Sequence, residues 1–291
     1  MFGLLARLGD LDLVEHMIDV LVHQQDHGKA DNPALLEAVT LLSPDRAAEH
    51  LEKIVAANAV NSLGPCGALL ASALKGAFAK TPMQLQGAVK TLLDLLPGDP
   101  ASAPQDQWGR PRVAKPDAAF IADLVDVVDR IDHGLARQAA AHVLAWPRHF
   151  DLDRILVPAA KRLIQAKRRR GAAFDAVYTA VVVHLETRIG EPLEAPRDWT
   201  RQSAIGCRCQ HCAELSAFLA DSTRESWTLR AAQQVRTHVE NEIRRAGADV
   251  DIQTLRRGSP HSLIAAKNQA SYKRRVAQRQ KDLADLAALR R

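Results

Sequence analysis

The sequence predicts a mainly α-helical protein, in which an antiparallel helical array precedes a small α+β module and a basic C-terminal helix. Alanine and leucine are abundant and only 4% of the residues are aromatic, a balance that favours helices over strands. Apolar residues recur at helical spacing through most of the chain. Three of the four cysteines fall within residues 207–212, which is typical of a metal-stapled module.

The composition is that of an ordinary globular protein with room for one or two domains. Of the 291 residues, 47% are apolar and 25% are charged, and no apolar run reaches the roughly 18 residues of a membrane span. We therefore expect no membrane contact and no signal peptide. Clustered thiols without a disulfide framework favour a reducing, cytoplasmic compartment.

The helical array is expected over residues 1–190, as a HEAT-like solenoid or as a closed bundle. Three residue–proline pairs predict helix starts, because a polar side chain caps free amides and proline suits the first helical position. The pairs are Asn32-Pro33, Ser43-Pro44 and Thr81-Pro82. The apolar-periodic stretches that follow them are 35–42, 47–57 and 85–96, with a glycine-punctuated segment at 63–78.

A linker rich in proline, glycine and serine is expected at residues 98–116, inside the array. Helical patterning resumes at Asp117, and Asp151 or Asp153 is expected to cap a later helix. That helix ends in the basic run 167–170 before Gly171, as helix C-termini favour. The expected helices are 117–131, 135–146, a segment from the capping aspartate to 170, and 172–189.

The second domain is expected at residues 206–291, after a second linker at 191–206. Ser222 or Thr223 is expected to cap its longer helix. Alternation of apolar and polar residues predicts a strand that pairs with the next segment in a hairpin. The expected elements are a helix at 214–219, a helix at 227–245, strands at 250–255 and 262–266, and a terminal helix at 268–291.

The clustered cysteines are the strongest candidate site. The three sulfur donors are Cys207, Cys209 and Cys212. Zinc suits thiolates and prefers four ligands in a tetrahedron, so a fourth ligand is needed. His238 on the predicted helix 227–245 is the preferred one, with His211 and His261 as alternatives. Four protein ligands leave no open position, so the zinc is expected to be structural.

The basic excess lies in the last third of the chain. Residues 201–291 carry 17 Lys/Arg against 9 Asp/Glu, a balance of +8, and the first 200 carry 22 against 25, a balance of −3. This excess indicates a solvated face or, as the alternative function, nucleic-acid binding. The expected phosphate contacts are Arg208, Arg244, Arg245, Arg256, Arg257, Lys267, Lys273, Arg274 and Arg275.

The order of motifs over residues 206–267 resembles the C-terminal module of large 2-oxoglutarate/iron(II) oxygenase-like proteins. The motifs are Cys207-x-Cys209-x-x-Cys212, Ala217-Phe218-Leu219, Arg236-x-His238, the run 257–263 (Arg-Gly-Ser-Pro-His-Ser-Leu) and Lys267. The resemblance implies that the chain is the C-terminal portion of such a protein or a stand-alone relative. The oxygenase domain of that family has no counterpart in this sequence.

The sequence contains no catalytic constellation of nucleophile, base and acid. Cys66 has no histidine or carboxylate beside it and is expected to be a packed core residue. We therefore expect a non-catalytic scaffold or binding protein with a protein partner, because helical arrays offer extended surfaces.

Overall fold

A computed structural model describes residues 10–24, 28–99, 105, 108–109, 114–168 and 170–291, which form two compact units. The first unit comprises Met1–Thr187 and Ala284–Arg291, and the second comprises Arg188–Leu283. The end of the terminal helix thus belongs with the first unit, whereas the sequence placed it with the second. Most of the expected linker at 98–116 lies outside the described residues.

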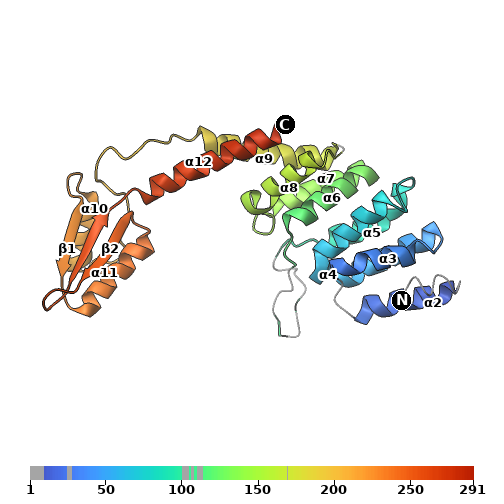
Figure 1. The fold of residues 1–291 in the computed structure, drawn as a ribbon, viewed down its shortest axis with the longest axis horizontal. Helices are drawn as coiled ribbons and strands as arrows, with labels where there is room; N and C mark the ends of the chain where they lie inside the picture. Colours follow the sequence, from blue (N-terminus) through green and yellow to red (C-terminus); the bar gives the residue numbers. More distant parts are fainter. Residues whose placement is uncertain (1–9, 25–27, 100–104, 106–107, 110–113, 169) are drawn as a thin grey trace. The chain divides into compact units, whose positions relative to one another are not determined.

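The first unit is the helical array that the sequence predicted. Its helices α2 to α8 follow one another in chain order (Figure 1). At its centre, α4 packs against α2, α3, α5 and α6, and α6 packs in turn against α7 and α8. The elements are α2 (Leu11–Gln24), η1 (Lys29–Asp31), α3 (Asn32–Val39), α4 (Pro44–Lys75), η2 (Pro82–Leu85), α5 (Gln86–Asp94), α6 (Ala118–Ile131), α7 (His133–Ala145), η4 (Leu152–Leu156), α8 (Val157–Gln165) and α9 (Ala172–Gly190).

The central helix α4 is longer than the sequence predicted. The expected helix 47–57 and the glycine-punctuated segment after it form one helix with a kink at Ser62 (φ −134°, ψ 50°). Pro65 lacks an amide proton and disturbs the preceding turn, which accounts for the kink. Among the described residues, only this helix is long and apolar enough to span a membrane, but 61% of its apolar window is buried inside the protein. It is therefore a core helix.

Helices begin at the expected prolines, but the polar side chains expected to cap them do not do so. Pro44 and Pro82 occupy first-turn positions, and neither Ser43 nor Thr81 makes a side-chain capping bond. Asn32 lies inside α3 instead of before it. Aspartates do the capping, since their carboxylates accept the amides of the first helical turn. They are Asp117 (from Phe120, 2.7 Å), Asp132 (from Leu135, 2.8 Å) and the expected Asp151 (from Arg154, 2.7 Å).

The start of α9 is capped from another helix. Asp129 on α6 accepts hydrogen bonds from the amides of Ala173 (2.8 Å) and Phe174 (2.9 Å). Gly171 is needed there, because a Cβ at that position would lie 2.5 Å from the carboxylate carbon of Asp129. The left-handed residue at the end of α8 is Lys167 (φ 49°), whereas the sequence suggested Gly171 for that role.

We expect Asp129→Ala to lower the free energy of unfolding of the first unit by about 1 kcal/mol, because two amides lose their acceptor. Urea unfolding measures the loss, and hydrogen exchange should show it first in the opening turn of α9. Asp129→Asn keeps an acceptor oxygen and should lose less. Equal losses in both variants would contradict a capping role.

The second unit is a small α+β fold. Its antiparallel sheet has the strand order β1-β3-β2, with Leu229 paired to Leu263 and Thr254 also opposite Leu263. One face of the sheet packs on α10 and α11 around Phe218, Trp227 and Val239. The strands 250–255 and 262–266 and the terminal helix are thus confirmed. The elements are α10 (Gln210–Ala220), β1 (Ser226–Arg230), α11 (Gln233–Ala246), β2 (Val250–Leu255), β3 (Ser262–Lys267) and α12 (Ala270–Leu289).

The prediction of one helix over 227–245 is wrong at its start. Residues Ser226–Arg230 form the edge strand β1, and the helix begins only at Gln233. Trp227 and Leu229 are buried while their neighbours are exposed, which is the alternation of a half-buried strand. Pairing with β3 therefore overrides the helical pattern read from the sequence alone.

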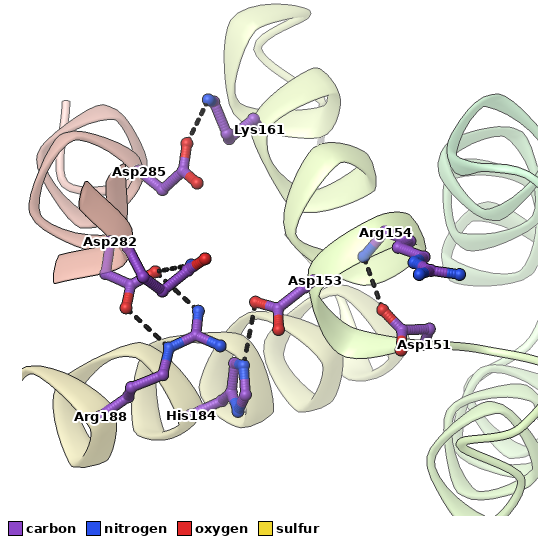
Figure 2. A network of polar contacts seen from close by, with 9 residues as sticks. Asp151, Asp153, Arg154, Lys161, His184, Arg188, Asp282 and Asp285 are labelled. Atoms are coloured by element: carbon purple, nitrogen blue, oxygen red, sulfur yellow. Dashed lines mark hydrogen bonds and ion pairs between the residues drawn. The ribbon is translucent and has the colours of Figure 1, made fainter. Parts of the chain in front are cut away.

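Buried carboxylates on α12 form ion pairs within each unit (Figure 2). In the first unit, Lys161 donates to Asp285 at 2.5 Å. In the second, Arg188 donates through Nε and Nη2 to the two carboxylate oxygens of Asp282, each at 2.6 Å. Asp282 is only 1% exposed, and this bidentate geometry compensates its charge.

Candidate metal centre

Two helices of the second unit position the candidate ligands. Cys207 and Cys209 lie just before α10, Cys212 lies in its first turn, and His238 lies in the middle of α11. The two helices share the core cluster of the unit, to which Leu215 of α10 belongs. Packing of that core brings the imidazole of His238, which lies 26 residues after Cys212 in the sequence, to the start of α10.

The four ligand atoms lie close enough together to share one metal ion. The three sulfurs and one imidazole nitrogen of Cys207, Cys209, Cys212 and His238 all lie within 4.8 Å of one another. His238 Nε2 is 3.6 Å from the sulfur of Cys209 and 3.3 Å from that of Cys212. Zinc bonds of about 2.3 Å to sulfur and about 2.0–2.1 Å to nitrogen give tetrahedral edges of about 3.5–3.8 Å. The group is therefore compatible with a bound metal ion.

The thiols differ in acidity because their surroundings differ. The pKa of Cys209 is lowered to about 6, mainly by a hydrogen bond from the backbone amide of Cys212. Side-chain hydrogen bonds with Cys212, Cys207 and His238 lower it further. Burial, followed by the neighbouring sulfurs, raises the pKa of Cys212 to about 12. A divalent cation favours deprotonation of the thiols that coordinate it, so it would remove this difference.

The two alternative histidines lie outside the cluster. His211 is half-buried on α10, and its Nδ1 has no hydrogen-bond partner among the described residues. His261 lies in the β2–β3 turn, where its Nδ1 is 2.9 Å from the carbonyl oxygen of Gly258. Of the three candidates for the fourth ligand, the structure brings only His238 to the cysteines.

Thiol alkylation should distinguish the cysteines of the metal-free protein. We expect iodoacetamide near neutral pH to label Cys209 before Cys66, because Cys209 is exposed in the folded second unit and stays accessible if removal of the metal unfolds that unit. Cys66 is fully buried in α4, and burial raises its pKa to about 12, so it should react only after denaturation. Mass spectrometry of the peptides measures both rates. Equal labelling of Cys66 and Cys209 in the folded protein would contradict this assignment.

Most of the expected phosphate-binding residues lie at the surface. Those exposed to solvent are Arg208, Arg244, Arg245, Arg256, Arg257, Lys273, Arg274 and Arg275. Three of them have carboxylate neighbours: Arg244 with Glu240 (3.9 Å), Arg245 with Glu242, and Arg274 with Asp249 (3.8 Å). The three arginine side chains stay largely exposed despite these contacts, so their charges remain accessible.

Lys267 does not belong to this exposed set. It is 4% exposed, its ammonium donates to the carbonyl oxygen of Asp221 at 2.6 Å, and it lies 4.5 Å from the ring centroid of Phe218. Burial lowers the pKa of Lys267. Its contacts tie β3 to the end of α10, a structural role that keeps its charge away from a phosphate.

Two arginines that were not among the expected phosphate contacts are also buried. Arg201 donates to the carbonyl oxygens of Asn268 (2.7 Å) and Thr200 (2.9 Å). Arg236 on α11 donates to the carbonyl oxygen of Ala231 at 3.1 Å. The only sequence signal for Arg201 was its place beside Trp199, whose ring centroid lies 5.4 Å from the guanidinium.

The motifs that carry the family resemblance are distributed over the second unit. The run 257–263 joins β2 to β3, with Gly258 at a positive φ of 75° and a cis bond between Ser259 and Pro260. Arg230 of β1 donates to the carbonyl oxygens of Ser259 (3.2 Å) and Pro260 (3.3 Å), which holds this turn to the sheet. No known protein family, curated protein or solved structure matches the chain.

Proposed function

We propose that the chain is a non-catalytic scaffold or binding protein whose second unit is held together by a structural zinc ion. The observation that carries the proposal is the convergence of Cys207, Cys209, Cys212 and His238 within 4.8 Å. Three sulfurs and one imidazole are a donor set that zinc accepts and that magnesium and calcium disfavour. Four protein ligands leave no open position for a reacting water, which favours a structural ion.

The position of the cluster supports a structural role. Cys212 and Leu215 are buried and lie three residues apart on α10, so the ion would bind directly beside the core of the unit. It would join the start of α10 to the middle of α11 across 26 residues of chain. A cross-link of this kind contributes most in small units with a limited core. Three metal-binding thiolates also suit a reducing, cytoplasmic compartment.

The first unit supports a binding role. Helical arrays present extended surfaces on which partner proteins dock. On α2, Leu11 and Leu13 are 47% and 39% exposed, and their side chains are free to contact a partner. The resemblance of residues 206–267 suggests the setting of this binding role. We infer that the chain works as the C-terminal accessory region of a 2-oxoglutarate/iron(II) oxygenase-like protein. Turnover of 2-oxoglutarate by this chain alone would contradict the non-catalytic assignment.

Elemental analysis of the purified protein tests the metal assignment. We expect about one zinc per chain, and a loss of most of it in Cys207→Ser and in His238→Ala. His211→Ala and His261→Ala are matched controls, because each removes an imidazole from the same unit outside the cluster, and both should keep the metal. Full zinc content in His238→Ala would place the fourth ligand elsewhere, and a metal-free wild type would refute the site.

Nucleic-acid binding is the second candidate function, and the eight exposed cations of the second unit favour it. Lys273, Arg274 and Arg275 lie in the first two turns of α12, and Arg256 and Arg257 lie at the β2–β3 turn. Binding to duplex DNA should weaken steeply with salt as phosphate counterions are released. Arg256→Gln with Arg257→Gln should reduce this slope, whereas Lys267→Met should not. Salt-independent retention on DNA would reject the hypothesis.

A further inference from the structure

The second unit contains a cleft that the metal centre does not use. It has a volume of about 580 Å³ and lies between the segment 196–203, the end of α11 and the first turns of α12. Polar side chains dominate its lining, and two arginines, Arg201 and Arg275, are among them. A volume of this size is typical of pockets that take a small organic molecule.

Arg201 is the unusual residue in the wall of this cleft. Its side chain is buried, with 6% of the residue exposed. Its Nε donates to the carbonyl oxygen of Asn268 at 2.7 Å, and its Nη1 donates to those of Asp198 (3.0 Å) and Thr200 (2.9 Å). Its Nη2 is buried and has no hydrogen-bond partner among the described residues. Buried donors are nearly always paired, so this nitrogen needs an acceptor that the described residues do not supply, such as a water or a ligand atom.

Two arginines and two aspartates line the cleft, and contacts within the chain engage both carboxylates: Asp198 accepts a hydrogen bond from the amide of Thr200 at 2.8 Å. The partners of Arg201 are carbonyl oxygens, which carry no formal charge. Asp249, a carboxylate of the lining, is already engaged by the amide of Ser271 (2.9 Å), by the Ser271 hydroxyl and by Arg274 at 3.8 Å. Arg275 adds a second, exposed guanidinium from α12. Guanidinium groups bind phosphate and carboxylate oxygens through charge-assisted hydrogen bonds.

We propose that this cleft binds a small molecule through an anionic phosphate or carboxylate group. One oxygen of that group accepts the hydrogen bond from Arg201 Nη2, and Arg275 neutralises its charge from the rim. The hydroxyls of Thr200 and Ser203, which also line the cleft, are available to the rest of the molecule. None of the four proposed metal ligands lines the cleft, so the two sites are separate.

Calorimetric titration of the full-length, metal-loaded protein tests the site, with inorganic phosphate and acetate as the probes at constant ionic strength. We expect one saturable site per chain for at least one probe. Arg275→Gln should weaken that binding by about tenfold or more, because a charge-assisted contact is lost. Lys281→Gln is the matched control: it removes the same charge from an exposed position of α12 outside the cleft, and should change the affinity less than twofold.

Each outcome decides the proposal. Binding of phosphate alone identifies a phosphoryl ligand, binding of acetate alone identifies a carboxylate ligand, and binding of both supports the shared site. Arg201→Gln should abolish binding, but its lost backbone contacts can also perturb the fold, so Arg275→Gln is the deciding variant. No saturable binding of either probe at millimolar concentrations would overturn the proposal. Equal weakening by Arg275→Gln and Lys281→Gln would overturn it too, because general surface charge would then explain the binding.

Discussion

Removing the metal with a strong chelator should unfold the second unit and leave the helices of the first unit intact. Structural zinc contributes on the order of 10 kcal/mol to the folding of small modules. A whole domain is stable by only about 5–15 kcal/mol, so a unit of this size cannot absorb that loss. We therefore expect the amides of β1, β2 and β3 to lose nearly all their protection against hydrogen exchange.

Hydrogen exchange with mass spectrometry measures the two units separately in one sample. Peptides from α4 and α6 serve as the internal control, because no candidate ligand lies in the first unit. Cys212→Ser should reproduce the effect of the chelator, and added zinc should restore protection to the wild type but not to this variant. Unchanged protection of the sheet after complete zinc removal would show that the apolar core alone holds the unit.

The largest effect of a single substitution in the first unit is expected at Phe120. This ring is 1% exposed, lies on α6 and meets α4 at Gly67. Phe120→Ala should lower the free energy of unfolding of the first unit by about 3–5 kcal/mol, through lost burial and the cavity that remains. Urea unfolding followed by hydrogen exchange in α4 and α6 measures it. A loss below about 1 kcal/mol would contradict a close-packed α4–α6 contact.

Gly67 provides a matched test of the same contact. A Cβ at this position would lie 2.7 Å from Cδ2 of Phe120, well inside the optimal carbon separation of about 3.5–4.0 Å. Gly67→Ala alone should therefore destabilise the unit by about 1–3 kcal/mol. In the Phe120→Ala background the obstruction is gone, and the same change should be neutral or stabilise the helix by up to about 1 kcal/mol. Additive effects of the two substitutions would contradict direct contact.

Features with a local cause were predictable from the sequence. The alternation of apolar and polar residues at 250–255 and the prolines at positions 44 and 82 are local signals, because they depend only on neighbouring residues. The corresponding strand and helix starts follow from them. The candidate metal ligands were also predictable, because three cysteines within six residues limit the fourth ligand to a few histidines. His238 was favoured because the predicted helix returned it to the cysteines, and the geometry agrees.

Features with a distant cause were not predictable. Residues Ser226–Arg230 become a strand only because β3 lies beside them. Asn32 donates to the carbonyl oxygen of Pro65, 33 residues away, in place of capping its own helix. Lys267 was expected to contact phosphate, and Arg201 was not singled out, because nothing in their neighbouring residues indicates the carbonyl oxygens that bury them. Each of these depends on pairing partners that only the folded chain brings together.

The division of the chain has a consequence for biosynthesis. The second unit is inserted into the sequence of the first, since Ala284–Arg291 belong with residues before Arg188. Leu286 and Leu289 are 7% and 1% exposed, so they complete the apolar interior of the first unit. A ribosome makes them after every residue of the inserted unit, and nascent domains otherwise fold in order of synthesis. The first 187 residues therefore keep part of their apolar surface uncovered until residues 284–291 have been made.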